Sequence, residues 1–376
     1  MRRLMLAGGG TGGHVYPLLA VLEALPQGSD VLYLGRRGSV EERLAAKHNV
    51  PFGPMPAAAV RGMAPWRVVA NLGRVTAGVG QALAAMRRFA PDAVLVTGGY
   101  VSVPAALAAW LLRRPLVVCL PDMEPGMAVR FLARLADRVT VSCPEVQGAL
   151  PQGKTVVTGY PVRRAFCEGD RTTARQRLGI APEERLLVIM GGSSGARNIN
   201  NAVLGCLPEL LQMASVWHIT GNLDCERVRQ AAEAALPESP LHGTCADGRY
   251  RIYSYVEGEM ADLLRAADLV VARAGAATLG EFPAVGVPSV VVPGSFAGGH
   301  QTPNATYLRD HGASVMVADD DLAEQLLPTV RELLQDPQRL ASMAAAARRL
   351  ANPQASRAIV AELQRAAQGR GRSGRR

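Results

Sequence analysis

The stretch that decides the fold is LMLAGGGTGGH, residues 4–14. Its apolar letters lead into a glycine turn, and an apolar helical pattern follows from Pro17. A short strand that enters a glycine-rich turn and then a helix is typical of parallel sheets built from βαβ units. The same order recurs in the second half, where LLVIM (residues 186–190) runs into GGSSGAR (residues 191–197). The sequence therefore predicts two domains that begin alike.

Strand-like runs alternate with helical stretches along almost the whole chain. This alternation predicts an α/β fold of doubly wound parallel sheets. The predicted strands are Leu4–Leu6, Val31–Leu34, Ala93–Val96, Leu116–Leu120, Val139–Val141, Thr155–Thr158, Leu186–Met190, Val216–Thr220, Arg251–Tyr255, Leu269–Ala272, Ser289–Val292 and Ser314–Val317. In such sheets the turns after the strands gather at the carboxyl edge, where ligands bind.

The strand pattern also predicts the domain boundaries, because it breaks around Tyr160–Arg185. We expect one Rossmann-like domain over residues 1–160 and a second over residues 161–340, facing each other across a cleft. The helical patterns of residues 341–367 are expected to cross back onto the first domain. The basic tail of residues 368–376 is expected to be disordered, since it consists mainly of arginine and glycine.

The composition fits a compact protein. A chain of 376 residues is long enough for two buried cores, and 48% hydrophobic with 19% charged residues excludes a mainly disordered chain. The longest apolar run, Val101–Leu112, is shorter than the roughly 20 residues that cross a bilayer, so we expect no transmembrane helix. Six cysteines without a C-x-x-C pair favour a reducing cytoplasm over a disulfide framework or a zinc site.

The formal net charge of +9 narrows the class of partner. A basic balance is typical of proteins that bind nucleic acid, anionic phospholipid or phosphorylated substrates. Aromatic residues make up only 5% of the chain, and it has no aromatic-basic motif that would stack bases, so we predict no nucleic-acid partner. An anionic membrane surface and a phosphorylated substrate both stay open.

The first glycine turn offers backbone amides to an anion. Gly8, Gly10 and Gly13 match the dinucleotide fingerprint G-x-G-x-x-G. A nicotinamide site also needs an acid at the end of the second strand, where residues 35–37 are Gly-Arg-Arg, so NAD is disfavoured and NADP stays open. His14 closes the turn, where an imidazole can take a proton from an incoming hydroxyl. A helix-capping or loop-packing imidazole is the alternative.

The second glycine turn also precedes a helical pattern. Its backbone amides, with the hydroxyls of Ser193 and Ser194, would form a cradle for pyrophosphate. No lysine follows in the turn, which argues against a P-loop nucleotidase. A tight structural turn is the alternative, although such a turn does not require two successive serines.

Two further loops of the second half carry polar side chains. The stretch RAGAATLGE, residues 273–281, has small residues that let a ligand approach the backbone, and Glu281 can accept hydrogen bonds from two adjacent ribose hydroxyls. The stretch GGHQTPN, residues 298–304, carries amide side chains that suit sugar hydroxyls. Ordinary exposed loop polarity is the alternative for each of these residues alone.

Six motifs in sequence resemble the MurG family of peripheral-membrane UDP-GlcNAc transferases, which convert lipid I to lipid II in peptidoglycan synthesis. The motifs are the glycine turn with His14, Thr97–Ser102, Thr158–Arg163, the Gly191–Ser193 turn, Gly275–Glu281 and Gln301–Asn304. The resemblance implies a GT-B fold, inversion at the anomeric carbon, and a place on the cytoplasmic face of the cell membrane. It also implies UDP-GlcNAc as donor and a lipid-linked sugar as acceptor.

The resemblance further implies roles for individual residues. Glu281 would hold the uridine ribose, and the backbone near Val256 the uracil. Arg163 and Ser193 would contact the diphosphate. Residues with supporting or sugar-facing roles on the donor side would be Ser194, Ala276, Thr278, His300, Gln301 and Asn304. Residues lining the acceptor side would be Thr11, Gly12, Gly13, His14 and Tyr100.

One segment departs from the family pattern. Where the family usually carries His-Glu-Gln-Asn after the fourth strand, this chain has Cys119-Leu120-Pro121-Asp122, so Asp122 stands where the family has asparagine. The sequence thus leaves open a transferase acting on another lipid-linked acceptor and, as a different enzyme class on this fold, a UDP-GlcNAc 2-epimerase. His14 or Asp122 would be the catalytic base. No clustered Asp-x-Asp or histidine pair suggests a metal site, which predicts metal-independent catalysis without a cofactor.

A lipid-linked acceptor would bring the protein to an anionic membrane surface. In residues 61–74, Trp66, Val69 and Leu72 fall at near-helical spacing among arginines. A basic-rimmed apolar patch of this kind can rest on anionic headgroups. A helix that packs on its own domain and turns its arginines outward is the alternative.

Overall fold

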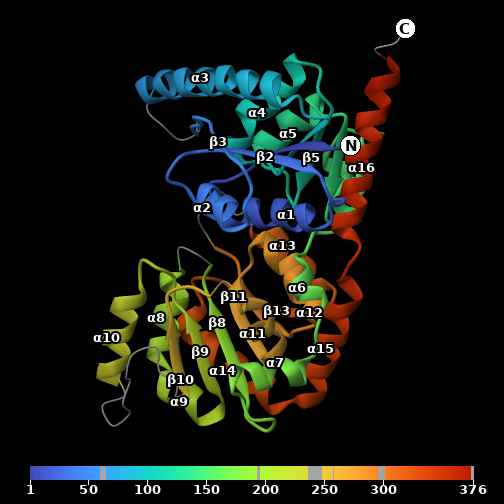
Figure 1. The fold of residues 1–376 in the computed structure, drawn as a ribbon. Coiled ribbons are helices and arrows are strands. Elements are labelled where there is room, and N and C mark those ends of the chain that lie inside the picture. The colour runs from blue at the N-terminus through green and yellow to red at the C-terminus, as the bar shows by residue number, and fades with distance from the viewer. Residues whose placement is uncertain (60–64, 193–194, 236–247, 257, 295–300, 374–376) are drawn as a thin grey trace. The chain divides into compact units, whose positions relative to one another are not determined.

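The computed structural model describes residues 1–59, 65–192, 195–235, 248–256, 258–294 and 301–373, without the side chains of residues 65–69 and 370–373. The chain folds into two compact units (Figure 1). Unit 1 comprises Met1–Arg164 and Asn352–Arg376, and unit 2 comprises Ala165–Ala351. Both ends of this chain therefore belong to unit 1.

Unit 1 is built on a parallel sheet, which has seven strands in the described part of the chain, in the order β3-β2-β1-β4-β5-β6-β7. These are β1 (Arg3–Ala7), β2 (Asp30–Gly35), β3 (Phe52–Pro54), β4 (Ala93–Val96), β5 (Leu116–Leu120), β6 (Arg138–Val141) and β7 (Thr155–Val157). The central strands β4 and β5 are buried throughout, which their uninterrupted apolar runs allow. The strand order reverses between β1 and β4, and this switch point is where doubly wound sheets bind ligands.

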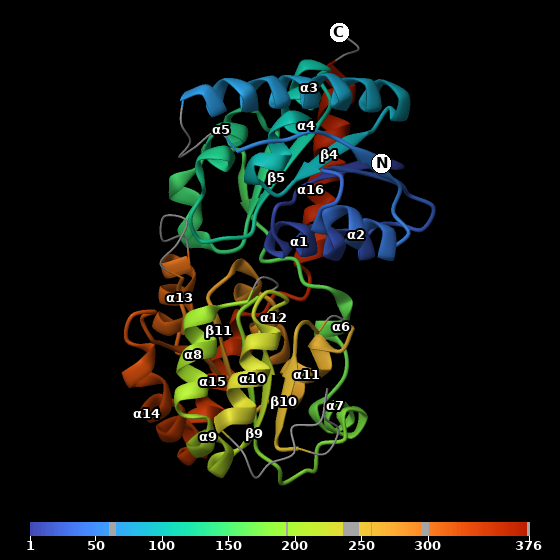
Figure 2. The same cartoon turned by 90° about the vertical axis from the view of Figure 1, so that its left-hand side faces the viewer.

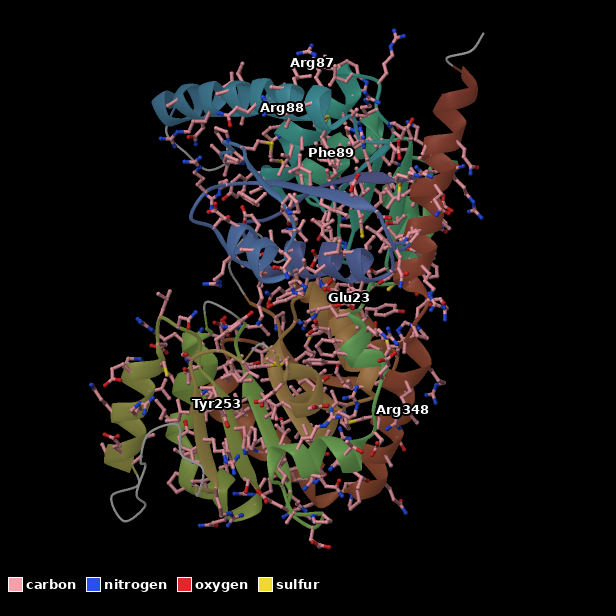
Figure 3. The ribbon with its side chains drawn as sticks, viewed as in Figure 1. Glu23, Arg87, Arg88, Phe89, Tyr253 and Arg348 are labelled. Carbon is pink, nitrogen blue, oxygen red and sulfur yellow. The ribbon has the colours of Figure 1, made fainter. Side chains whose placement is uncertain are left out.

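Helices cover both faces of this sheet. They are α1 (Gly12–Glu23), α2 (Val40–Lys47), α3 (Pro65–Phe89), α4 (Gly99–Leu111), α5 (Met127–Leu135) and the 3-10 helix η1 (Pro144–Ala149). Helix α3 packs along α4, and α4 packs against α5 (Figure 2). The described part of α3 carries no acidic residue, and Arg87 and Arg88 at its end are exposed (Figure 3).

Unit 2 repeats the architecture with a parallel sheet of six strands among its described residues, in the order β10-β9-β8-β11-β12-β13. These are β8 (Leu186–Met190), β9 (Ser215–Ile219), β10 (Tyr250–Tyr253), β11 (Leu269–Arg273), β12 (Ser289–Val292) and β13 (Ser314–Met316). The surrounding helices are α6 (Arg164–Cys167), α7 (Arg171–Leu178), α8 (Arg197–Gly205), α9 (Leu207–Met213), α10 (Cys225–Ala235), α11 (Met260–Ala266), η2 (Ala276–Leu279), α12 (Glu281–Val285), α13 (Gln301–Asp310), α14 (Leu322–Gln335) and α15 (Pro337–Leu350). In β8, Val188 lies opposite Trp217 on one side and Val270 on the other.

The predicted strands all occur, with ends shifted by at most two residues, and one strand was missed. Strand β3 has three residues, includes a glycine and a proline, and pairs only with β2 at the sheet edge. Proline cannot donate a hydrogen bond to a ladder and is confined to such edges. The three residues Phe, Gly and Pro also lack the apolar alternation by which a strand is predicted. The pairing with Tyr33–Gly35, rather than local preference, makes this segment a strand.

The C-terminal helix α16 (Ala355–Ser373) belongs to unit 1, whereas α15 belongs to unit 2. Its buried side chains Ile359, Val360 and Leu363 lie at one-turn spacing and join the core formed with β1, β4 and α1. Asn352 Nδ2 donates to the Thr158 carbonyl at 2.9 Å as the chain enters unit 1. Figure 1 shows α16 lying along the sheet of unit 1.

The basic tail differs from the expectation of disorder. Helix α16 continues to Ser373, so residues 368–373 are helical. A helix whose first turns are packed on a core extends at low cost, because each added residue gains a hydrogen bond without a new nucleus. Residues 374–376 lie outside the described part of the chain. No helix of the described residues is long and apolar enough to span a bilayer.

Replacing the fully buried Leu363 by alanine should destabilise unit 1, since it leaves a cavity between α16 and the sheet. We expect the free energy of unfolding to fall by about 2–5 kcal/mol. Native-state hydrogen exchange of the β4 and β5 amides measures this loss. Arg357→Ala, an exposed change in the same helix, is the control. Equal exchange in the Leu363 and Arg357 variants would contradict the packing described.

Candidate functional site

A glycine turn follows the strand at the switch point of each sheet. In unit 1 the turn joins β1 to α1, and in unit 2 it joins β8 to α8. Gly10, Gly192 and Gly195 have φ values of 88°, 80° and 81°, a backbone conformation that favours glycine. The two turns therefore lie at the carboxyl edges where doubly wound sheets bind ligands.

The turn of unit 1 is already filled by a carboxylate of the protein itself. Glu41 of α2 is fully buried, and its oxygens accept from the backbone N–H groups of Gly10 and Arg36, both at 3.3 Å. A Cβ atom on Gly9 would lie 2.5 Å from the Glu41 carboxyl carbon. An anionic ligand at this turn would meet the Glu41 charge, so the turn is not a free phosphate cradle.

Sequence reasoning missed Glu41. It stands in the first turn of a helix whose N-cap, Ser39, accepts from the Glu42 N–H at 3.4 Å. An acid in that position is ordinarily an exposed residue that interacts with the helix dipole. Nothing in the local pattern indicates that its side chain turns inward to the glycine turn.

The His14 ring is held by hydrogen bonding to Thr97. His14 Nδ1 lies 3.1 Å from the Thr97 carbonyl oxygen, and the Thr97 hydroxyl donates to the His14 carbonyl at 2.6 Å. Because a carbonyl oxygen only accepts, Nδ1 carries a proton, and in the neutral ring Nε2 then has the lone pair. A Cβ on Gly99 would lie 3.5 Å from Nε2, so glycine at this position leaves the nitrogen uncrowded. His14 thus has the tautomer that a general base requires.

Other residues predicted for the acceptor side lie at the same edge of the sheet as His14. Tyr100 is the second residue of α4, after β4, and its ring lies 3.4 Å from where a Gly10 Cβ would be. Arg36 lies over the Tyr100 ring at 5.4 Å from its centroid. Asp122 follows β5, the next strand of the sheet, and is half-buried. Thr11 is the exposed N-cap of α1, which Gly12 and Gly13 begin.

Arg163 lies beside α1, although it is far from it in sequence. Its guanidinium is 4.5 Å from the centroid of the Tyr16 ring, which is the geometry of a cation–π contact. The Tyr16 ring also fills the space next to Gly12, where a Cβ would lie 3.2 Å from it. The structure therefore holds the predicted diphosphate ligand Arg163 on unit 1, next to the first turn.

In unit 2 the glycine turn packs against the end of β9. A Cβ on Gly195 would lie 2.3 Å from the Thr220 carbonyl oxygen, so only glycine fits there. Ser193 and Ser194, the predicted diphosphate contacts, lie outside the described residues. The helix that follows, α8, points its N-terminus out of this turn, which is the arrangement that binds phosphate groups.

The loop after β11 is held by polar side chains from three elements. Thr278 Oγ1 donates to the Gly275 carbonyl at 2.7 Å, and Asn304 Nδ2 donates to the Ala274 carbonyl at 3.0 Å. Arg273 pairs with Asp319 at 2.5 Å. Glu281, which begins α12, is 7% exposed. The predicted donor residues of this loop, Ala276 included, therefore come together at one edge of the sheet.

The remaining predicted donor residues are placed less completely. Gln301 Oε1 accepts from the Gly294 N–H at 2.8 Å, so this side chain holds the loop after β12. Val256 follows β10, whose last residue Tyr253 is labelled in Figure 3. His300 lies outside the described residues. No group of three or more His, Cys, Asp or Glu side chains that could hold a metal ion occurs among the residues described.

Family profiles cover most of the chain. The glycosyltransferase family 28 N-terminal domain matches residues 4–141, and the family 28 C-terminal domain matches residues 186–360. A protein of Roseiflexus sp. (strain RS-1) is 38% identical over 417 residues, covering 95% of this chain and 93% of that protein. It is named UDP-N-acetylglucosamine–N-acetylmuramyl-(pentapeptide) pyrophosphoryl-undecaprenol N-acetylglucosamine transferase. The crystal structure of Acinetobacter baumannii MurG matches with a TM-score of 0.72 and 29% identity, covering 97% of this chain and 100% of that one.

The chain belongs to glycosyltransferase family 28, within the MurG family. Its two Rossmann-like units are those of the GT-B fold. UDP-GlcNAc 2-epimerase from Neisseria meningitidis, solved with UDP-GlcNAc bound, also matches with a TM-score of 0.67 at 15% identity, covering 97% of this chain and 100% of that one. At that identity the likeness shows the fold alone.

Sequence reasoning also missed a series of hydrogen-bonded, buried polar side chains behind the second glycine turn. His218 on β9 is fully buried, with Nδ1 at 2.8 Å from the Tyr250 hydroxyl and Nε2 at 3.0 Å from Asn200 Oδ1. Burial lowers the pKa of His218 to about 3, although Asp224 nearby acts in the opposite direction. Hydrogen bonds from Arg227 lower the pKa of Asp224 to about 2 against the effect of desolvation. His218 is therefore neutral at working pH.

This burial predicts a pH-dependent stability of unit 2. Between about pH 6.5 and 3 the unfolded chain binds a proton on His218 that the folded chain does not, so stability falls as the pH falls. We expect a loss of about 2 kcal/mol between pH 6.5 and 5, since one such proton contributes about 1.4 kcal/mol per pH unit.

Urea unfolding at pH 6.5 and pH 5, followed by Trp217 fluorescence, measures this loss of stability. The other two tryptophans, Trp66 and Trp110, are changed to phenylalanine so that only Trp217 reports. His218→Gln should remove this part of the pH dependence. Val203→Ala, a buried apolar change in α8, should lower stability equally at both pH values. An unchanged pH dependence in His218→Gln would contradict the assignment.

Proposed function

We propose that the protein transfers N-acetylglucosamine from UDP-GlcNAc to the MurNAc hydroxyl of lipid I, giving lipid II for peptidoglycan synthesis. The observation that carries this proposal is the nearly full-length likeness to relatives named as N-acetylglucosamine transferases of N-acetylmuramyl-(pentapeptide) pyrophosphoryl-undecaprenol. The site geometry supports it, because unit 1 holds a histidine with the tautomer of a base and unit 2 holds a glycine turn before a helix.

The donor is proposed to bind at the carboxyl edge of unit 2. The diphosphate would lie at the N-terminus of α8, where the backbone N–H groups and the helix dipole favour negative charge, with Ser193 and Ser194 assisting. Arg163, also expected at the diphosphate, belongs to unit 1. Glu281, which is 7% exposed, would accept from the ribose hydroxyls. Val256 would face the uracil, and Thr278, Gln301 and Asn304 would fix the loops around the sugar.

In the reaction, the acceptor oxygen would attack the anomeric carbon while the bond from that carbon to the UDP oxygen breaks. UDP leaves with the electron pair, and the hydroxyl proton passes to His14 Nε2. Attack from the face opposite UDP inverts the anomeric carbon. The growing charge on UDP would be stabilised by the α8 N-terminus, an effect usually larger than that of the base. Asp122, after β5, which is separated from β1 by β4 in the sheet, is the second candidate for the base.

The acceptor side is proposed to be the edge of unit 1. The buried Glu41 charge disfavours a diphosphate at the first glycine turn, and neutral hydroxyls suit Thr11 and Tyr100 better. The segment Cys119–Asp122 lies at this edge, where β5 ends. Burial raises the pKa of Cys119 to about 11, so its thiol stays protonated and serves packing rather than proton transfer.

We also propose that unit 1 rests on the anionic cytoplasmic face of the cell membrane. Helix α5 presents Met127 and Phe131, 60% and 46% exposed, on the same face as the exposed Arg130 and Arg134. Leu72 on α3 is 57% exposed. Apolar side chains rimmed by arginines are typical of surfaces that enter the headgroup region. Of the patch predicted over residues 61–74, the side chains of residues 65–69 lie outside the description.

The transfer is tested by measuring UDP release from UDP-GlcNAc with and without lipid I. We expect release only with the lipid-linked acceptor, and Glu281→Ala should lower kcat/KM for UDP-GlcNAc at least about 100-fold, the equivalent of two hydrogen bonds to a charged group. Glu324→Ala, which removes an exposed carboxylate on α14, is the control. A panel of other lipid-linked sugars tests whether Cys119–Asp122 changes the acceptor.

Full-rate release without acceptor would overturn the proposal, as would a product with altered stereochemistry at C2 of the sugar, which is the outcome of an epimerase.

Membrane association is tested by sedimentation with vesicles of anionic phospholipid. The double change Met127→Ser and Phe131→Ser should reduce binding strongly, and wild-type binding should weaken as salt screens the arginines. Leu223→Ser, at the most exposed large apolar residue among those described in unit 2, is the matched control. Equal binding by the double variant and wild type would rule out this face.

A further inference from the structure

The buried side chains behind the second glycine turn form a series of hydrogen bonds in which every donor and acceptor is defined. Asn200 Nδ2 faces two acceptors, the Thr220 carbonyl at 3.0 Å and Asp224 Oδ2 at 2.8 Å, so its Oδ1 faces His218. His218 Nε2 must then donate to Asn200 Oδ1, and Nδ1 accepts from the Tyr250 hydroxyl. Each member has one defined hydrogen-bonding role, and the neutral imidazole completes the chain without a charge.

The far end of the chain is closed by an ion pair. Arg227 Nε and Nη2 each lie 2.7 Å from one oxygen of Asp224, and Arg197 Nε lies 3.5 Å from the same carboxylate. Asp224 is almost fully buried and is therefore held in one orientation by a bidentate partner. Arg197 begins α8, directly after the glycine turn. The network thus connects β10, β9, the start of α10 and two residues on one face of α8.

The network acts on the turn through one carbonyl group. The Thr220 oxygen that Asn200 holds is the atom against which Gly195 packs, at 2.3 Å from the position of a Gly195 Cβ. Gly191 N also donates to the neighbouring Ile219 carbonyl at 3.4 Å. A turn of glycines has little conformational preference of its own, so its shape depends on the surface beneath it. That surface is the end of β9, which is held in place by the hydrogen bonds of Asn200 and His218.

We propose that Asn200 and His218 are positioning residues that set the glycine turn of unit 2 in the shape that binds the diphosphate of the donor. This inference rests on the proposed function, because it assigns the turn to UDP-GlcNAc. The pair touches no substrate; it acts through the Thr220 carbonyl on Gly195. Loss of the pair would let the end of β9 and the turn move, which weakens donor binding while the acceptor side in unit 1 stays intact.

The test compares binding of UDP by calorimetry and the KM values of both substrates in a set of variants. Asn200→Leu and His218→Leu should each raise the Kd for UDP and the KM for UDP-GlcNAc by about tenfold or more, the equivalent of one hydrogen bond to a charged group, with the KM for the lipid acceptor unchanged. His218→Gln should restore most of the affinity, because its amide can still donate to Asn200 Oδ1.

Two further variants separate positioning from stability. Val203→Ala, in the core beneath α8, should lower Tm but bind UDP as wild type does. Tyr250→Phe removes only the hydroxyl at the start of the chain and should raise the Kd by a smaller factor while the protein stays folded.

Normal UDP affinity in folded Asn200→Leu or Tyr250→Phe would overturn the inference, as would equal weakening in Val203→Ala at the same loss of Tm. Failure of wild-type protein to bind UDP or turn over UDP-GlcNAc would instead contradict the proposed function.

Discussion

The constraint on which both halves of the molecule depend is the need to hold a glycine turn in one shape at the end of a parallel strand. Glycine permits the positive φ values and close approaches seen at Gly10 and Gly195, and the same freedom makes such a turn costly to order. In each unit, buried polar side chains from other elements supply the missing restraint. Glu41 does so in unit 1, and Asn200 with His218 does so in unit 2.

The two restraints have opposite electrostatic consequences. In unit 1 the restraining group is a carboxylate that uses the Gly10 N–H, so the turn cannot also receive a phosphate without meeting a negative charge. In unit 2 the restraining groups contact a carbonyl beneath the turn, and the nearby carboxylates of Asp224 and Asp319 bind the side chains of Arg197 and Asn198 rather than a backbone N–H of the described turn residues. Two turns that look alike in sequence thus differ in the ligands they suit, which supports assigning the donor to unit 2 and the acceptor to unit 1.

The sequence predicted the sheets well because their strands are short apolar runs between helices, and this pattern is local. It missed β3, which is a strand only because β2 pairs with it. The candidate residues on the loops were predicted from residue type and from family resemblance, and the structure brings His14, Tyr100 and Asp122 to one edge. It could not predict the inward turn of Glu41 or the burial of His218, since both depend on partners distant in the chain. Asn304 was predicted along the sugar, and in the structure its fully buried amide holds the Ala274 carbonyl.

A crystal structure of the protein with UDP bound tests the central claim most directly, namely that the glycine turn of unit 2 and not that of unit 1 receives the diphosphate. The account predicts phosphate oxygens at the N-terminus of α8 and the ribose hydroxyls within hydrogen-bond distance of Glu281. Phosphate oxygens at the turn beside Glu41, or a ribose remote from Glu281, would contradict it.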